Sequence, residues 1–82
     1  MNRHVEFEFW LRKRLKNVLN PLRKELAEEA QVPPYVVFHD STLREMAAAR
    51  PETLAQLGRL PGIGAKKLEA YGEQFLRAIQ RH

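Results

Sequence analysis

The chain has 82 residues, of which 44% are hydrophobic and 29% charged, and this size and composition predict one small globular domain. The absence of cysteine excludes disulfides, zinc–thiolate sites and thiol catalysis. The sequence also lacks an apolar run of the roughly 20 residues that span a bilayer, and its N-terminus lacks the apolar core of a signal peptide, so we expect a cytoplasmic domain.

The basic charge is concentrated at the start of the chain. The formal net charge is +4, and residues 1–24 hold seven basic side chains against Glu6 and Glu8. Residues 25–82 hold seven basic and eight acidic side chains, so the rest of the domain is nearly neutral. A basic helix indicates an anionic partner such as nucleic acid, although it is also common as a solvated face.

A long amphipathic helix is predicted from about residue 6 to residue 30. Its apolar residues recur at steps of three and four, as on one helix face. They are Phe7, Trp10, Leu11, Leu15, Val18, Leu19, Leu22 and Leu26. Asn20-Pro21 interrupts this stripe, because Asn is a good N-cap and Pro suits the first helical position. We therefore expect a kink or a split there.

Three short elements are expected between residues 32 and 59. The run Tyr35–Phe38 follows two prolines and is compatible with a strand or with one helical turn. A helix should then start with Asp40, Ser41 or Thr42 as its N-cap, with Thr42 and Glu45 in capping-box spacing, and end at Arg50-Pro51. Thr53 and Gln56 form a second capping-box pair, which opens a short helix with Leu54 and Leu57 facing inward.

The segment 60–72, LPGIGAKKLEAYG, places a glycine-rich turn before the last helix. That helix has its apolar face at Leu68, Tyr71, Gly72, Phe75, Leu76 and Ile79. The sequence contains no internal repeat and no internal linker. We therefore predict an all-α fold, a small compact bundle of about five helices.

The same turn is a candidate phosphate site. Gly62 and Gly64 leave backbone amides uncovered, and the first-turn amides of the next helix carry the positive end of the helix dipole. Lys66 and Lys67 in that turn strengthen the field, although lysine there opposes the dipole. The alternative is a tight turn in which Ile63 plugs the core. Spacing alone does not favour either interpretation.

Tyr35 is the second candidate. A tyrosine at the start of an element can stack on a nucleobase, an interaction worth roughly 1–3 kcal/mol per base. The pattern alone favours the alternative that Tyr35 packs in the core with its hydroxyl satisfied.

Catalytic and metal-binding patterns are absent from the sequence. His4, His39 and His82 share no metal-ligand spacing, and a helix cap explains Asp40 better than a metal site. The sequence has no nucleophile elbow and no phosphate-binding P-loop. We therefore expect a non-catalytic domain without a cofactor.

Residues 15–82 resemble an HRDC domain, the small helical module at the C-terminus of RecQ-family helicases and of RNase D. The motifs VPPYVVFHDSTLREMA and LPGIGAKKLEAYG carry the resemblance, in the correct order, and are most similar to the bacterial RecQ version. The second motif also resembles the helix-hairpin-helix turn that grips DNA phosphates. Residues 1–14 have no counterpart in the family, so we treat them as a helical N-terminal extension; Asn20-Pro21 also departs from the family pattern.

The resemblance implies an auxiliary module that binds single-stranded or partly duplex DNA weakly and tunes the substrate choice of a helicase in DNA repair and recombination, in the bacterial cytosol. It assigns the stacking role to Tyr35 and places basic neighbours at Lys66 and Lys67, with Arg23 and Lys24 from the first helix; Gly62 and Gly64 belong to the turn. Arg44 and Arg59 are weaker candidates. Some HRDC domains instead serve protein contacts, so docking on the parent helicase or another protein is the alternative. We expect a monomer in isolation.

Overall fold

The computed structural model describes the backbone of residues 3–82 and the side chains of residues 6–82; Met1 and Asn2 lie outside the described residues. All regular elements in this range are helices, as the sequence predicts. They are α1 (Arg3–Ala30), α2 (Pro34–Val37), α3 (Asp40–Ala49), α4 (Leu54–Gly58) and α5 (Ala65–Arg81). None of the described helices is long and apolar enough to cross a membrane.

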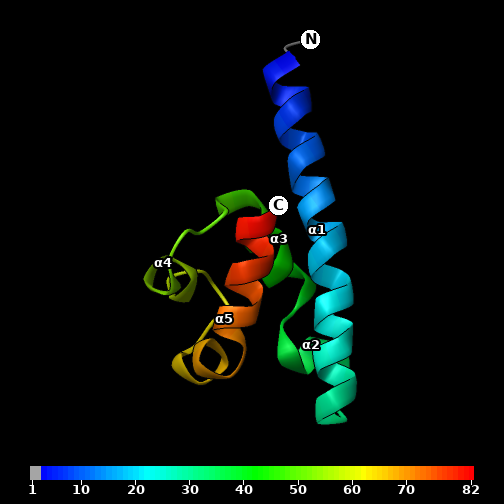
Figure 1. Ribbon diagram of the computed structural model, residues 1–82, viewed down its shortest axis with the longest axis vertical. Coiled ribbons are helices and arrows are strands. Elements are labelled where there is room, and N and C mark those ends of the chain that lie inside the picture. Colours follow the sequence, from blue (N-terminus) through cyan, green and yellow to red (C-terminus); the bar gives the residue numbers. More distant parts are fainter. Residues whose placement is uncertain (1–2) are drawn as a thin grey trace.

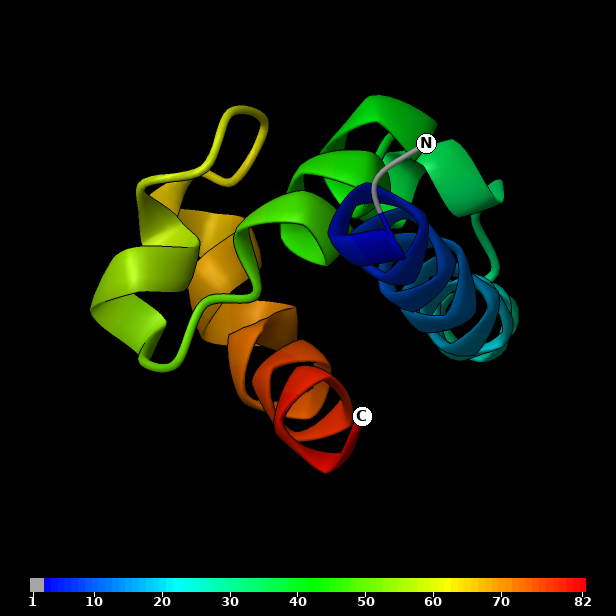
Figure 2. The same ribbon diagram turned by 90° about the horizontal axis from the view of Figure 1, so that it is seen from above.

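The two longest helices, α1 and α5, form the framework of the fold, and the three short helices pack against them. Figures 1 and 2 show α1 along one side of the molecule, with α2 and α3 against it and α4 on the far side of α5. The first turns of α1 extend beyond the other helices, which makes the molecule 44 Å long but only 24 and 20 Å across (Figure 1).

The predicted split at Asn20-Pro21 is wrong, because α1 is one helix that includes Pro21. Pro21 is exposed, while the buried stripe continues on both sides of it through Leu19 and Leu26. Packing of this stripe against α2, α3 and α5 offsets the hydrogen bond that Pro21 cannot donate. Asn20 does not cap a helix, since its side-chain oxygen accepts a hydrogen bond from Arg23.

The caps of the short helices differ in part from those predicted. Residues 34–37 form a helical turn, which decides between the two alternatives for that run. The N-cap of α3 is His39, not Asp40, Ser41 or Thr42, and no capping box forms there. Thr42 is buried, and its hydroxyl donates to the carbonyl of Pro61 at 3.3 Å, because the turn before α5 packs on this end of α3.

Two other predicted boundaries are confirmed. α3 ends at Ala49, and its C-cap, Arg50, adopts the left-handed conformation before Pro51. The hydroxyl of Thr53 accepts a hydrogen bond from the Gln56 amide at 3.1 Å, and this bond caps α4. Leu57 is fully buried as expected, whereas Leu54 is 37% exposed and covers Gly72 at the edge of the core.

Phe38 lies at the centre of the core. Its ring is fully buried and meets the ring of Phe75 edge-on, with centroids 4.9 Å apart. Tyr71 approaches the same ring from one turn earlier in α5, at 6.0 Å. Leucines of α1, α3 and α4 complete this core, and each such buried side chain stabilises the fold by about 1.5–3 kcal/mol. The buried leucines are Leu15, Leu19, Leu26, Leu43 and Leu57.

The turn before α5 is fixed by close packing. Gly62 has φ +86°, a left-handed conformation that favours glycine, and a Cβ added there would collide with the hydroxyl of Thr42. Ile63 is buried and plugs the core, as one interpretation of the motif predicts. Gly64 is different, because it has negative φ and no atom within 4 Å of a Cβ built on it.

The two glycines should therefore respond differently to alanine. Gly62→Ala should lower the free energy of unfolding by about 1–3 kcal/mol, because alanine is strained at this φ and its methyl group displaces Thr42. Gly64→Ala, the matched control in the same turn, should change it by less than about 1 kcal/mol. Urea denaturation followed by helical circular dichroism measures both, and equal effects would contradict the packing described.

Candidate nucleic-acid interface

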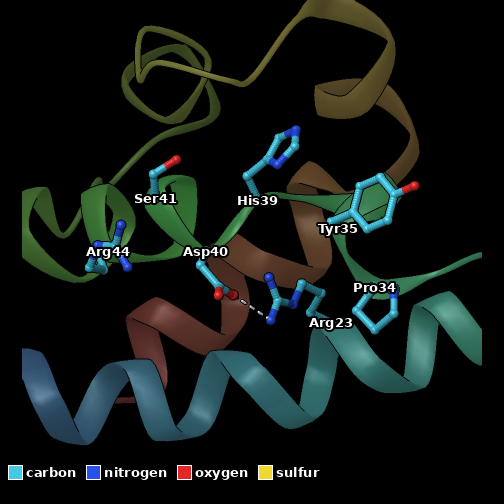
Figure 3. Close-up of a pocket in the computed structure, with 7 residues that line it drawn as sticks. All are labelled: Arg23, Pro34, Tyr35, His39, Asp40, Ser41 and Arg44. Atoms are coloured by element: carbon cyan, nitrogen blue, oxygen red, sulfur yellow. Dashed lines mark ion pairs between the residues drawn. The ribbon is translucent and has the colours of Figure 1, made fainter.

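Tyr35 is presented to solvent by a short, well-anchored helix. Pro33 and Pro34 fix the start of α2, while Val37 and Phe38 at its other end are fully buried. The Tyr35 side chain is 58% exposed, and its ring lies 5.9 Å from the ring of His39. Its hydroxyl points away from the neighbouring labelled side chains (Figure 3). The core position that the pattern favoured is therefore wrong.

Arg23 connects α1 to the segment between α2 and α3. Its guanidinium donates to the carbonyl of Phe38 at 2.9 Å and lies 2.7 Å from the carboxylate of Asp40 (Figure 3). The Arg23 side chain is only 14% exposed. Both terminal nitrogens of the guanidinium are thus engaged within the domain, Nη2 also by the side chain of Asn20, so Arg23 holds α1 against the segment that follows α2.

The carboxylate of Asp40 is held ionised by this contact. The hydrogen bond from Arg23, together with its positive charge, lowers the pKa of Asp40 below its ordinary value, and Lys16 and Arg44 act in the same direction. The Asp40 side chain is 64% exposed, so the pair is open to solvent on the carboxylate side. Asp40 also lies in the first turn of α3, where a negative charge is favourable to the helix dipole.

An open hollow of about 470 Å³ lies beside Tyr35. Its lining is contributed by α1, by α2 and by the start of α3 (Figure 3): Arg23, Pro34, Tyr35, His39, Asp40, Ser41 and Arg44. Arg44 is exposed, so the structure places a cation in the same hollow as Tyr35. The sequence alone ranked Arg44 as a weak candidate, because its face relative to α2 depends on how α3 packs.

The glycine-rich turn before α5, at Gly62 and Gly64, packs against the first turn of α3. Thr42 connects the two, since it packs against Gly62 and donates to Pro61. Lys67 is half-buried, with its ammonium group 5.9 Å from the centroid of the Phe38 ring, close to the segment that carries Tyr35. Lys66 and Gly64 are exposed. Gly64 is the N-cap of α5, and it has no side chain that could cover the first-turn amides.

The structure thus brings most of the predicted site residues to one end of the molecule. Tyr35, the turn at Gly62 and Lys67 all surround the segment that joins α2 to α3. Lys24 is exposed, but it does not line the hollow beside Tyr35. Sequence reasoning missed His39 and Ser41 as lining residues. Local spacing does not signal either residue, because α2 ends at Val37 and the backbone is extended at Phe38 and His39.

This arrangement is suited to binding a nucleic acid. It combines an exposed aromatic ring, cations and uncovered backbone amides, which are the groups that contact bases and phosphates. Among the described residues, no three His, Asp or Glu side chains are grouped so that they could hold a metal ion.

Comparison with known proteins places the chain among helicase domains. The family model of the HRDC domain matches residues 12–79. The ATP-dependent DNA helicase RecQ of Haemophilus influenzae is 43% identical over 61 residues, which cover 74% of this chain and 10% of that protein. RecQ of Bacillus subtilis is 44% identical over 64 residues, which cover 78% of this chain and 11% of that protein. The chain thus spans about a tenth of the length of these relatives.

Two further comparisons agree with this. The ATP-dependent DNA helicase UvrD2 of Mycobacterium tuberculosis is 45% identical over 62 residues, which cover 76% of this chain and 9% of that protein. A solved structure, the third HRDC domain of D. radiodurans RecQ, superposes with a TM-score of 0.82 at 44% identity. That superposition covers 85% of this chain and 92% of the solved domain, so the two folds agree over nearly their whole length.

The pair of Arg23 and Asp40 should make stability depend on pH. The folded pKa of Asp40 is lower than the unfolded one, so its contribution is present at neutral pH and is lost as the pH falls through the folded value. Asp40→Asn should therefore melt at a lower temperature than the parent chain at pH about 7, and this difference should shrink below about pH 4.

Glu45→Gln is the control, because it removes an exposed carboxylate from the same helix without touching Arg23. Its free energy of unfolding should stay within about 0.5 kcal/mol of the parent's at both pH values. Thermal melts followed by circular dichroism measure these differences. A deficit of Asp40→Asn that is equally large in acid would contradict the role assigned to the pair.

Proposed function

Because the chain belongs to the HRDC domain family, we propose that it acts as an auxiliary, non-catalytic module of a RecQ-type DNA helicase that binds single-stranded or partly duplex DNA. In this role it tunes which DNA substrates the helicase engages during repair and recombination. Such a module works where the chromosome lies, in the bacterial cytosol. The relatives are called ATP-dependent DNA helicases, and the chain corresponds to only a small part of them.

The exposure of Tyr35 is the observation that carries this proposal. Tyr35 is 58% exposed and contacts the His39 ring on one side, while Val37 and Phe38 anchor α2 in the core without it. Its ring is free to stack on a base, and Arg44 in the adjoining hollow can neutralise a neighbouring phosphate.

The turn before α5 supplies the second contact. A phosphate near Gly64 would meet the first-turn amides of α5 and the positive end of its dipole, with Lys66 beside it. Lys67 adds positive charge beside the Phe38 ring, three residues along the chain from Tyr35. A strand that stacks on Tyr35 would therefore continue past Lys67 toward Gly64.

The expected affinity is low. One stacking residue and a few phosphate contacts predict dissociation constants on the order of micromolar or weaker, with little sequence preference and strong salt dependence. Stacking and phosphate contacts serve DNA and RNA alike, so a single-stranded RNA of matched sequence belongs in every titration.

Docking on a protein is the alternative function. An apolar hollow of about 460 Å³ between the start of α1 and α3 supports it, because Phe9, Ala47 and Ala48 line it together with several cations. Docking of this kind would leave the domain without DNA affinity at low salt. The absence of DNA binding at low salt would therefore favour docking over the proposal.

Tyr35 should dominate DNA binding. Tyr35→Ala should weaken binding of a fluorescein-labelled single strand by roughly 5- to 150-fold, which corresponds to the loss of one stacked base. Tyr35→Phe keeps the ring and should bind as the parent does. Val36→Ala removes a neighbouring exposed apolar side chain and should also bind normally. Fluorescence anisotropy measures all four proteins, with circular dichroism to show that each is folded. Unchanged binding by Tyr35→Ala would refute the stacking role.

Lys66 and Lys67 should set the salt dependence. The double variant Lys66→Ala/Lys67→Ala should reduce the slope of log affinity against log salt by about 1.4, because each phosphate contact with a single strand contributes about 0.7. Arg77→Ala/Arg81→Ala removes the same charge from the other end of α5 and should leave the slope nearly unchanged. Anisotropy titrations over a salt series give the slopes. Equal slopes for the two double variants would restrict the turn to a structural role.

A further inference from the structure

The first turns of α1 carry an aromatic and charged face that the rest of the domain leaves uncovered. Phe7 and Trp10 are 57% and 50% exposed, and their rings stack with centroids 6.4 Å apart. The guanidinium of Arg14 lies 5.2 Å from the centroid of the Trp10 ring, on the same side of the helix. Exposed aromatic clusters of this kind mark interaction surfaces in soluble proteins.

This surface, here called the Trp10 face, points away from the core. At 3.6 residues per turn, its members lie within about 60° of Trp10 around the helix axis, whereas Leu15 and Leu19 lie roughly 140° and 180° away. Figure 1 shows that the first turns of α1 rise beyond the other four helices, so another helix can approach them without meeting the domain body. The members of the Trp10 face are Glu6, Phe7, Trp10, Lys13 and Arg14, all exposed.

The order of charges along the Trp10 face identifies its occupant. The face is acidic at Glu6, aromatic at Phe7 and Trp10, and basic at Lys13 and Arg14. A surface that complements this face must carry basic, then aromatic, then acidic side chains along the same direction of the helix axis. The Trp10 face of a second copy has this order when its helix runs antiparallel, so a second copy of the chain is complementary to it.

We propose that the chain forms a two-fold symmetric dimer in which the Trp10 faces of two copies pair antiparallel. With Trp10 at the centre, Glu6 and Lys13 lie on one edge of the face and Phe7 and Arg14 on the other, each about 4.5–6 Å from Trp10 along the helix. An antiparallel pair brings like edges together, so Glu6 of one copy lies beside Lys13 of the second copy, and the two-fold axis repeats this contact. Phe7 lies beside Arg14 of the second copy in the same way, in reach of a cation–π contact. The proposed dimer differs from the monomer that the sequence predicts.

The dimer should be weak and reversible. A contact between about three turns of two helices is smaller than the interfaces of stable complexes, so we expect a dissociation constant on the order of 100 µM. Sedimentation equilibrium of the whole chain from about 10 µM to about 1 mM brackets this value. Over the same range the emission of Trp10, the single tryptophan, should shift to shorter wavelength as the ring leaves water.

Charge exchange tests the pairing register. Glu6→Arg and Lys13→Glu should each weaken self-association roughly tenfold, because each places like charges opposite each other at both symmetric contacts. An equimolar mixture of the two variants should associate about as well as the parent chain, since every contact in the mixed dimer again joins opposite charges. Glu25→Arg and Arg81→Glu are matched controls outside the face, and alone or mixed they should associate as the parent does.

Two results would overturn the proposal. A parent chain that stays monomeric to about 1 mM, with unchanged Trp10 emission, would leave the Trp10 face to a partner of another kind. A mixture of Glu6→Arg and Lys13→Glu that associates no better than either variant alone would exclude the antiparallel register. The exchanged side chains are exposed, and circular dichroism of each variant shows whether the fold is intact.

Discussion

Phe38 is the residue on which both the fold and the interface depend, because its ring and its carbonyl connect three parts of the chain. The ring is fully buried against Phe75 and Tyr71 of α5, while the carbonyl accepts a hydrogen bond from Arg23 of α1. Truncating a buried phenylalanine typically costs about 3–5 kcal/mol. The segment between α2 and α3 is therefore held from two sides, and the exposed side chains next to it have a rigid base.

The surroundings of Phe38 explain how a small domain, nearly neutral outside residues 1–24, can present a defined candidate interface. Tyr35 lies one helical turn before Phe38, and the ammonium group of Lys67 lies over the Phe38 ring. The start of α3 follows directly, and through Thr42 it fixes the turn at Gly62. The turn has a structural role through Ile63 and still leaves Gly64 open at the helix N-terminus, so the two interpretations of LPGIGAKKLEAYG are compatible.

Several features of the fold follow from local chemistry and were predictable. The Thr53 cap, the end of α3 before Pro51 and the apolar face of α5 depend on near neighbours in the sequence. The error at Pro21 has a different origin. Local propensity favours a break there, but the stripe that includes Leu19 and Leu26 buries enough surface against other helices to keep α1 continuous. Asn20 and Asp40 were also expected to cap helices, and both instead contact Arg23. The contact with Asn20 lies within α1, three residues apart, whereas Asp40 meets Arg23 because α3 packs on α1.

The sequence by itself determined the all-α class, the HRDC family and most helix ends, because these follow from periodicity, caps and two local motifs. The identities of Tyr35, Lys66 and Lys67 as site candidates also came from those motifs. Only the tertiary structure decided that Tyr35 is exposed, that Arg44 shares its hollow, and that Arg23 is occupied by Phe38 and Asp40. It also decided that Phe7 and Trp10 face solvent. Exposure depends on which helices pack on each face, and that packing joins residues too far apart in the chain for local patterns to predict.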